Sequence, residues 1–155
     1  MNQIFEEIIK PYNGTESFGF GTKYREVKDR IKAEHLSFRQ SERSNKGCEV
    51  DWPWVILNVE ESITLVFVKD VLFEIVFSNA YKGKLPNGCC LGMNMAELEK
   101  LDNSLEYSDI ENDYSSKEGY WVTEDDLGYI DSITIFVKEI EDSNFYKYEW
   151  IKKYL

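Results

Sequence analysis

The sequence has few of the residues that build metal sites, disulfide frameworks and proton relays. Among its 155 residues are one histidine, His35, and three cysteines. One histidine excludes a histidine-based metal cluster, and three cysteines are too few, and odd in number, for a disulfide framework. We therefore expect no catalytic centre, no cofactor and no metal, and the cysteine content favours a reducing compartment such as the cytoplasm.

Long hydrophobic runs are also missing. The longest candidate, Ile63–Phe77, is interrupted by Lys69, Asp70 and Glu74, whereas a membrane helix needs about 20 predominantly apolar residues. The first ten residues are mixed and acidic, unlike a signal peptide. Hydrophobic residues still make up 43% of the chain and aromatic residues 15%, which favours a folded domain over disorder. These features predict a cytoplasmic protein that does not bind membrane.

Basic residues are the minority, and they are unevenly distributed. The chain has 29 acidic and 18 basic residues, for a net charge of −11. Residues 1–96 carry 13 acidic and 12 basic residues, whereas residues 97–149 carry 16 acidic residues and 4 lysines. Such a field repels nucleic acid and anionic membrane and attracts basic proteins. Solubility alone would also account for acidic character, but its segregation favours a basic partner.

No linker divides the chain, which instead contains a weak internal repeat. One copy consists of Tyr12, Gly14 and Gly19. The second copy, Tyr81, Gly83 and Gly88, has the same spacing. Each glycine-marked loop precedes a helix-like segment and then strand-like segments. We therefore predict an α+β fold of two tandem helix-then-antiparallel-strand units, forming one sheet packed on helices. The first unit spans 1–79, and the second, acidic unit spans 80–155, within one compact chain.

Periodicity and capping predict the elements of each unit. Apolar residues at three- and four-residue spacing indicate helices over 22–34, with Thr22 as N-cap, and over 94–102, with Asn94 as N-cap. A short helix is expected over Asn2–Ile9, and the tail 145–155 is a helix or a strand. Branched and aromatic residues predict strands over 54–59, 63–68, 71–78, 120–123 and 130–137. Lys69 and Asp70 predict a tight hairpin turn.

Several motifs that suggest chemistry fail on inspection. Both glycine pairs have the spacing of a phosphate-binding loop, but Phe20-Gly21 and Cys89-Cys90 replace the required Lys-Ser/Thr. The series Asp109, Glu111 and Asp113 resembles a calcium loop, but tyrosines hold the positions that need glycine and glutamate. Cys89-Cys90 has no neighbouring histidine, and buried fillers are the simpler interpretation. We therefore predict that the protein is not an enzyme.

Three stretches carry a resemblance to a known family. They are Tyr81–Leu98, Glu118–Asp126 and Ile133–Glu139. Together they are similar to immunity proteins of bacterial polymorphic toxin systems, particularly contact-dependent growth inhibition systems. The helix start followed by antiparallel strands also resembles units of the β-lactamase-inhibitor-like and outer-membrane lipoprotein assembly folds, although the chain has no lipobox.

The resemblance implies a cytoplasmic antitoxin that binds one cognate toxin domain, often a nuclease, and blocks its active site. The alternative is an acidic adaptor or scaffold that binds another basic protein. Either partner would meet carboxylates that steer the encounter and aromatic residues that anchor it. Charge and aromatic content select the candidate partner-binding residues, which are Asp109, Glu111, Asp113, Glu118, Tyr120, Trp121, Glu124, Asp125 and Asp126.

Overall fold

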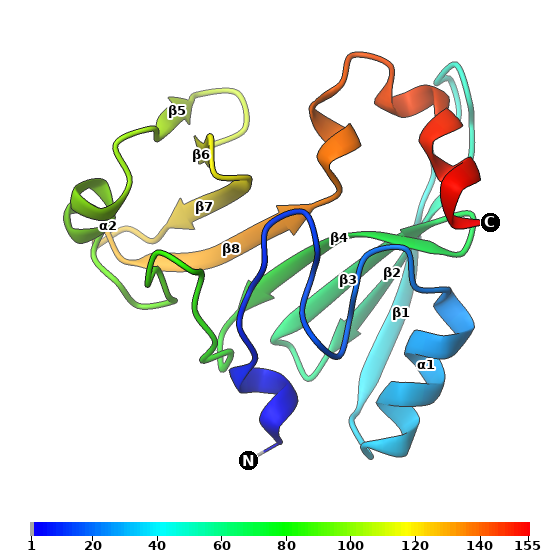
Figure 1. Ribbon diagram of the computed structural model, residues 1–155, viewed down its shortest axis with the longest axis horizontal. Coiled ribbons are helices and arrows are strands. Elements are labelled where there is room, and N and C mark those ends of the chain that lie inside the picture. Colours follow the sequence, from blue (N-terminus) through cyan, green and yellow to red (C-terminus); the bar gives the residue numbers. More distant parts are fainter. Residues whose placement is uncertain (1) are drawn as a thin grey trace.

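The protein has an α+β fold built on one eight-stranded antiparallel sheet. The computed structural model describes residues 2–155 (Figure 1). The strands follow the order β1-β2-β3-β4-β8-β7-β6-β5 across the sheet. The elements are η1 (Gln3–Glu6), α1 (Tyr24–Ala33), β1 (Phe38–Arg43), β2 (Trp54–Val59), β3 (Ile63–Val68), β4 (Val71–Ser78), α2 (Met95–Leu101), β5 (Glu106–Ser108), β6 (Asp113–Ser116), β7 (Tyr120–Glu124), β8 (Ile130–Phe136), η2 (Lys138–Glu141), η3 (Phe145–Lys147) and η4 (Glu149–Tyr154).

Every neighbouring pair of strands is antiparallel, and most hairpin connections are short, the longest being residues 44–53 between β1 and β2. Helix α1 is followed by β1–β4 and α2 by β5–β8, and the last strands of the two sets pair with each other in the register Ile75↔Ile135. The predicted hairpin turn between β3 and β4 is confirmed. Lys69 and Asp70 both have positive φ, the conformation of a type I′ turn, which matches the twist of the flanking strands.

One face of the sheet holds the main core. Strand residues at alternate positions point to this face, including Leu57, Leu65, Ile75 and Ile133, all fully buried. Helix α1 covers them with Val27 and Ile31, and the N-terminal segment and α2 add further apolar side chains. We call this the helix face, and the opposite one the outer face.

The outer face is covered at one end only. The C-terminal segment 145–154 packs Phe145, Tyr148 and Ile151 against Trp54 and Phe73. The Tyr148 hydroxyl accepts a hydrogen bond of 2.9 Å from the Trp54 indole nitrogen. Figure 1 shows α1 and this C-terminal segment on opposite sides of β1–β4. The rest of the outer face has no helix over it.

The tail, predicted as a helix or a strand, forms the 3₁₀ helices η3 and η4, with Phe145 and Tyr148 buried. Several other local predictions differ from the structure. Residues 2–9 form only the short 3₁₀ helix η1, capped by Asn2. Lys23, not Thr22, is the N-cap of α1, while the Thr22 hydroxyl donates to the Gly19 carbonyl. Strands β1, β5 and β6 were not predicted, because their polar sequences lack strand periodicity. No helix within residues 2–155 has the length and apolar character needed to cross a membrane.

Gly83 tests how tightly the loop before α2 packs on the N-terminal segment. A Cβ at this position would lie 2.0 Å from the Glu7 carbonyl oxygen. We expect G83A to lower the free energy of unfolding by about 1–3 kcal/mol, because backbone must move to admit the methyl group. The control is G88A in the same loop, where the space is open but φ is +93°, so that only backbone strain of about 1–2 kcal/mol is added. Urea unfolding measures the free energy of unfolding of both variants. A G83A variant as stable as wild type would contradict this packing.

Candidate functional site

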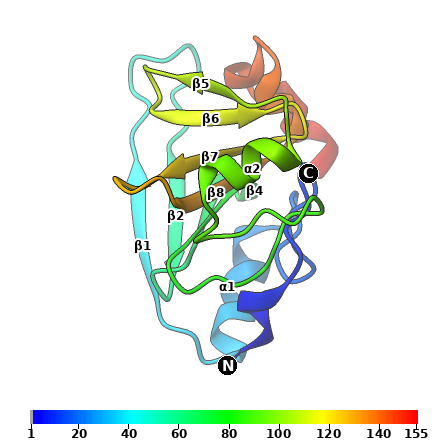
Figure 2. The same cartoon turned by 90° about the vertical axis from the view of Figure 1, so that its left-hand side faces the viewer.

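Two acidic turns lie at the same end of the second half of the sheet. Residues 109–112 connect β5 to β6, and residues 125–129 connect β7 to β8. Because these strands are neighbours and antiparallel, both turns emerge from the same strand ends, on the left in Figure 2. Two strand spacings, about 10 Å, separate them. This acidic end contains six of the predicted partner-binding residues, namely Asp109, Glu111, Asp113, Glu124, Asp125 and Asp126.

Local hydrogen bonds hold both turns in a fixed shape. The Asp125 carboxylate accepts from the backbone N–H groups of Leu127 and Tyr129, at 2.9 and 3.0 Å. In the other turn, the Ser108 hydroxyl accepts from the Glu111 N–H at 3.2 Å. Asp125 therefore shapes its own turn, whereas the carboxylates of Glu111 and its exposed neighbours are presented on a preformed scaffold.

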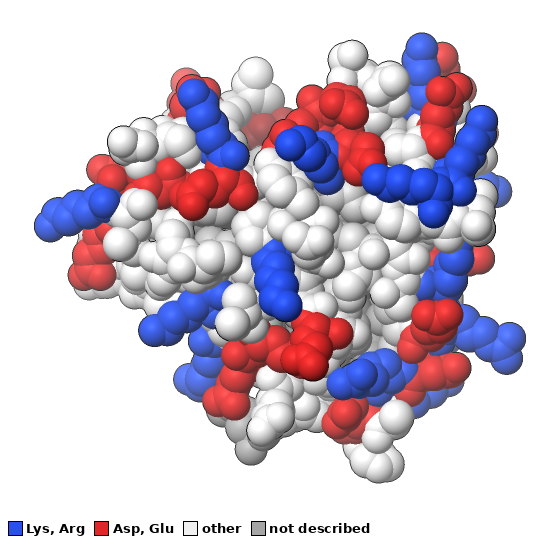
Figure 3. Space-filling view, in the orientation of Figure 1, with Lys and Arg blue, Asp and Glu red and all other residues white. Residues whose placement is uncertain are grey.

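Like charges accumulate at the acidic end. Partial burial raises the pKa of Asp113, and the nearby charge of Glu111 raises it further. The Tyr114 hydroxyl donates to Glu124 at 3.0 Å, and burial together with this bond raises the pKa of Tyr114. Figure 3 shows that on the side of the molecule turned to the viewer acidic and basic side chains are interspersed. The acidic end, by comparison with that side, brings together six acidic residues of two neighbouring turns and their flanking strands.

Exposed apolar side chains stand at the tips of the two turns. Ile110 is 91% exposed and Leu127 is 78% exposed, and Tyr107 on β5 is also exposed. Sequence analysis missed all three. The available signal was an apolar residue in the middle of each acidic turn, where a polar residue is expected. Apolar anchors ringed by charge are the usual make-up of a protein-binding surface.

The other three predicted residues lie elsewhere. Glu118 is in the β6–β7 turn, at the opposite end of these strands. Tyr120 is only 1% exposed and belongs to the main core, which leaves it no side-chain surface for a partner. Trp121, its neighbour on β7, points to the outer face and packs against Phe136 with ring centroids 4.3 Å apart.

A buried carboxylate explains where Tyr120 points. The Tyr120 hydroxyl donates to Asp102 at 2.5 Å, and hydroxyl groups of Ser104 and Ser116 donate to the same carboxylate. Burial by itself would raise the pKa of Asp102, but these hydrogen bonds outweigh it and hold the pKa well below its ordinary value. This network ties the end of α2 to β6 and β7, and it is structural.

A hollow lies beside Trp121 on the outer face of the second half of the sheet. Its volume is about 450 Å³, and its lining includes Phe136, Lys117, Glu106 and Glu141. The charges in it are of both signs and are exposed. It offers a binding surface with one aromatic wall. The Tyr12 hydroxyl donates to Glu141 in its lining, and the lining hydroxyls of Ser104 and Ser116 donate to Asp102.

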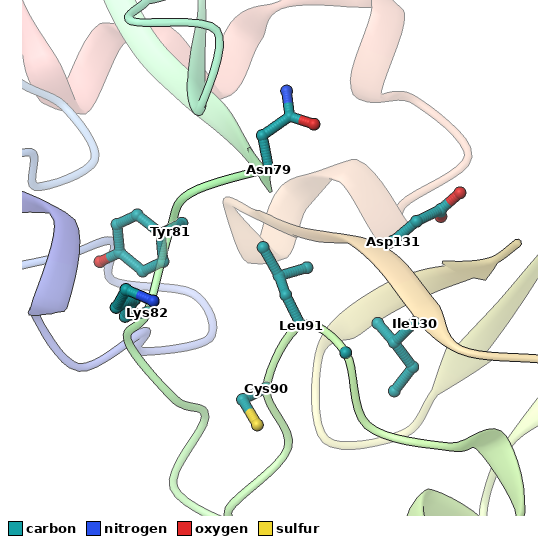
Figure 4. A pocket seen from close by; sticks show the side chains of 8 residues that line it. Asn79, Tyr81, Lys82, Cys90, Leu91, Ile130 and Asp131 are labelled. Atoms are coloured by element: carbon teal, nitrogen blue, oxygen red, sulfur yellow. The ribbon is translucent and has the colours of Figure 1, made fainter.

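The larger pocket in Figure 4 joins the loop before α2 to the start of β8. Its volume is about 510 Å³, and Lys82, Cys90 and Asp131 are the reactive side chains at its wall. These side chains make no hydrogen bond to one another. The adjacent Cys89 is fully buried, and burial, Cys90 and Asp102 raise the pKa of its thiol to about 12. A protonated, buried thiol is not a nucleophile.

Within residues 2–155, no three His, Cys, Asp or Glu side chains are grouped so that they could hold a metal ion. We compared the chain with protein-family models, with curated proteins and with solved structures, and none of them matched. The site is therefore interpreted from its own geometry, and the acidic end with its two exposed apolar tips is the best candidate.

Proposed function

We propose that this protein is a cytoplasmic immunity protein that binds a cognate toxin domain, a nuclease in the simplest case, and blocks its active site. The observation that carries the proposal is the acidic end, where carboxylates surround Ile110 and Leu127 on two rigid turns. The proposal requires no chemistry from the protein, because inhibition follows from occupying the toxin's cleft. The sequence resemblance to immunity proteins supports it.

A nuclease cleft suits this surface because its substrate is a polyanion. Basic side chains that hold phosphates attract carboxylates by the same field, which speeds the encounter. The exposed apolar tips would then be buried and provide the anchoring contacts. The carboxylates of Asp109, Glu111 and Asp126 make no hydrogen bond or ion pair within the described part of the chain, so they are available to such a partner.

We also infer that the fold consists of two tandem units, as the repeat of glycine spacings suggests. The order of one helix and four strands, given twice, supports this inference. So does the sheet order, in which the second set of strands runs in reverse from the pairing of β4 with β8. In this arrangement the second unit would be the one whose acidic residues bind the toxin domain.

Coexpression tests the proposal. The C-terminal domain encoded by the adjacent upstream reading frame is produced in cells with and without this protein. We expect growth arrest without it, rescue with it, and a complex that copurifies. A stable complex with a harmless basic protein and no rescue would favour the adaptor alternative, and the absence of a complex would refute toxin neutralisation.

Charge reversal at the acidic end should slow association with that toxin domain. We expect the triple variant D109K, E111K and D126K to lower the association rate about 10- to 100-fold at low salt, because steering is lost. The wild-type rate should fall as salt rises, since the screening length shortens to about 8 Å at physiological ionic strength. Stopped-flow or surface-based kinetics across a salt series provides the measurement.

The matched control reverses three exposed acidic residues of the first half, Glu26, Asp29 and Glu49. It changes net charge equally, and its association rate should change no more than about threefold if position matters rather than total charge. Equal slowing in both triple variants, or an association rate indifferent to salt, would show that the acidic end has no special role.

A further inference from the structure

A carboxylate without a partner lies near the middle of the outer face. Glu74 is on β4, the strand that joins the two halves of the sheet through its pairing with β8. A β-bulge at Phe73 shifts the register, so that Glu74 lies opposite Val66 on β3 and Phe136 on β8. Both neighbours belong to the outer face, and the bulge therefore turns Glu74 to that face.

The surroundings of Glu74 are apolar, and its side chain is partly exposed. Val66 is 4% exposed and Phe136 is 1% exposed, and Phe73 beside it is fully buried. The Glu74 carboxylate makes no hydrogen bond and no ion pair within the described residues. Burial raises its pKa to about 7, and the positive charge of Arg43 opposes this shift.

Arg43 is the cation whose field acts on Glu74, and Lys117, Glu106 and Glu141 line the neighbouring hollow that contains Phe136. Arg43 on β1 faces the outer side, but its guanidinium lies over the Trp54 ring, 4.8 Å from the centroid. The cross-strand neighbours on β3 and β8 are apolar, and the C-terminal segment contributes Tyr146 and Tyr148, which contact Trp54. No cation of this part of the chain is paired with the Glu74 carboxylate.

The outer face around Glu74 is only partly covered. The C-terminal segment packs over Trp54 and Phe73 in a cluster that also includes Val66. Tyr12 packs edge-on against Phe136, with ring centroids 6.1 Å apart. Ile56, Val76, Thr134 and Trp121 are outer-face residues that remain partly exposed. A long side chain entering here would lay its aliphatic stem on apolar groups while its head reached the carboxylate, as lysine and arginine do.

We propose that this part of the outer face receives a lysine or arginine side chain of the toxin domain, which forms an ion pair with Glu74. The inference rests on the proposed function and names one contact of the inhibitory complex. Charge complementarity selects the occupant, because a cation offsets the cost of an ionised carboxylate in an apolar setting. Docking would exclude water from the contact, where a charge-assisted hydrogen bond is strong.

Two matched variants test the contact against the toxin domain of the upstream reading frame. E74Q keeps the shape and removes the charge, and E97Q removes one exposed charge from α2 on the helix face. We expect E74Q to bind about 10- to 100-fold more weakly at pH 8, and E97Q to bind within about twofold of wild type. Calorimetry at pH 6, 7 and 8 should show wild-type affinity rising about tenfold with pH, in step with ionisation of Glu74, and E74Q affinity lacking this rise.

The outcomes separate the two proposals. If wild type binds and neutralises the toxin but E74Q binds equally well at every pH, the Glu74 contact is refuted while the immunity function stands. If wild type forms no complex with the toxin domain, both are refuted. If E74Q and E97Q weaken binding equally, net charge accounts for the loss, and the Glu74 contact is again refuted. Circular dichroism and urea unfolding establish that both variants fold.

Discussion

Replacement of Asp102 by alanine is expected to destabilise the protein by about 3 kcal/mol. The variant removes the acceptor for the hydroxyl groups of Ser104, Ser116 and Tyr120, and each buried donor left without a partner costs about 1–3 kcal/mol. The bond between Ser104 and Ser116 recovers part of this cost, whereas the Asn87 amide donates to the Tyr120 oxygen and leaves the Tyr120 O–H without an acceptor. D102N retains one acceptor oxygen and should lose less.

Urea unfolding at pH 7 measures this effect, and D109A is the matched control, because Asp109 is exposed and its carboxylate makes no hydrogen bond or ion pair within the described residues. Its free energy of unfolding should change by less than about 0.5 kcal/mol. The pKa of Asp102 is depressed in the folded protein, so its contribution is present above the ordinary pKa of 3.8 and is lost as pH falls below it. A D102A variant within about 1 kcal/mol of wild type would contradict the role of this network.

The opposite dependence on pH is expected for Glu74. Its pKa is raised from 4.5 to about 7 in the folded protein, so the folded state holds a proton that the unfolded state has released. The contribution of Glu74 to stability is therefore fully present below pH 4.5 and is lost as pH rises through 7. The whole shift corresponds to about 3 kcal/mol. E74Q should match wild type at pH 4.5 and exceed its stability by up to about 3 kcal/mol at pH 8.

Urea unfolding at pH 4.5, 6 and 8 measures the difference between the two proteins, so that other titrating groups cancel. E97Q should follow the wild-type curve at each pH, because its carboxylate is exposed. If the free energies of unfolding of wild type and E74Q do not diverge between pH 4.5 and 8, the Glu74 carboxylate is hydrated in the folded protein and the prediction is wrong. A stability gain combined with weaker binding would be the trade-off typical of a functional residue.

The candidate site was only partly predictable because its residues are defined by strand ends and strand faces. The acidic residues of 109–126 were evident from the sequence, but their meeting at one end depends on the lengths of β5–β8. Alternation places Tyr120 and Trp121 on opposite faces, yet either could have faced the core. The hydroxyl of Tyr120 settles this, because Asp102 at the end of α2 accepts from it on the helix face.

Glu74 illustrates a further limit. In the sequence, Glu74 is a charged residue that interrupts an apolar run. This interruption counts against a membrane helix, but it does not indicate on which face of the sheet Glu74 lies. Strict alternation would have put it on the helix face, opposite to Phe73. The bulge at Phe73, set by the register of β3 against β4, places it on the outer face.

The sequence by itself determined the helices near 24–33 and 95–101, the apolar strands β2, β3, β4, β7 and β8, and the turn at Lys69-Asp70, because these depend on local periodicity and turn chemistry. It also determined the charge asymmetry. The tertiary structure decided the strands β1, β5 and β6, whose polar sequences are extended only because neighbouring strands supply hydrogen-bond partners. It likewise decided the 3₁₀ tail over Trp54 and the face on which Glu74 lies, since both depend on packing between segments far apart in the chain.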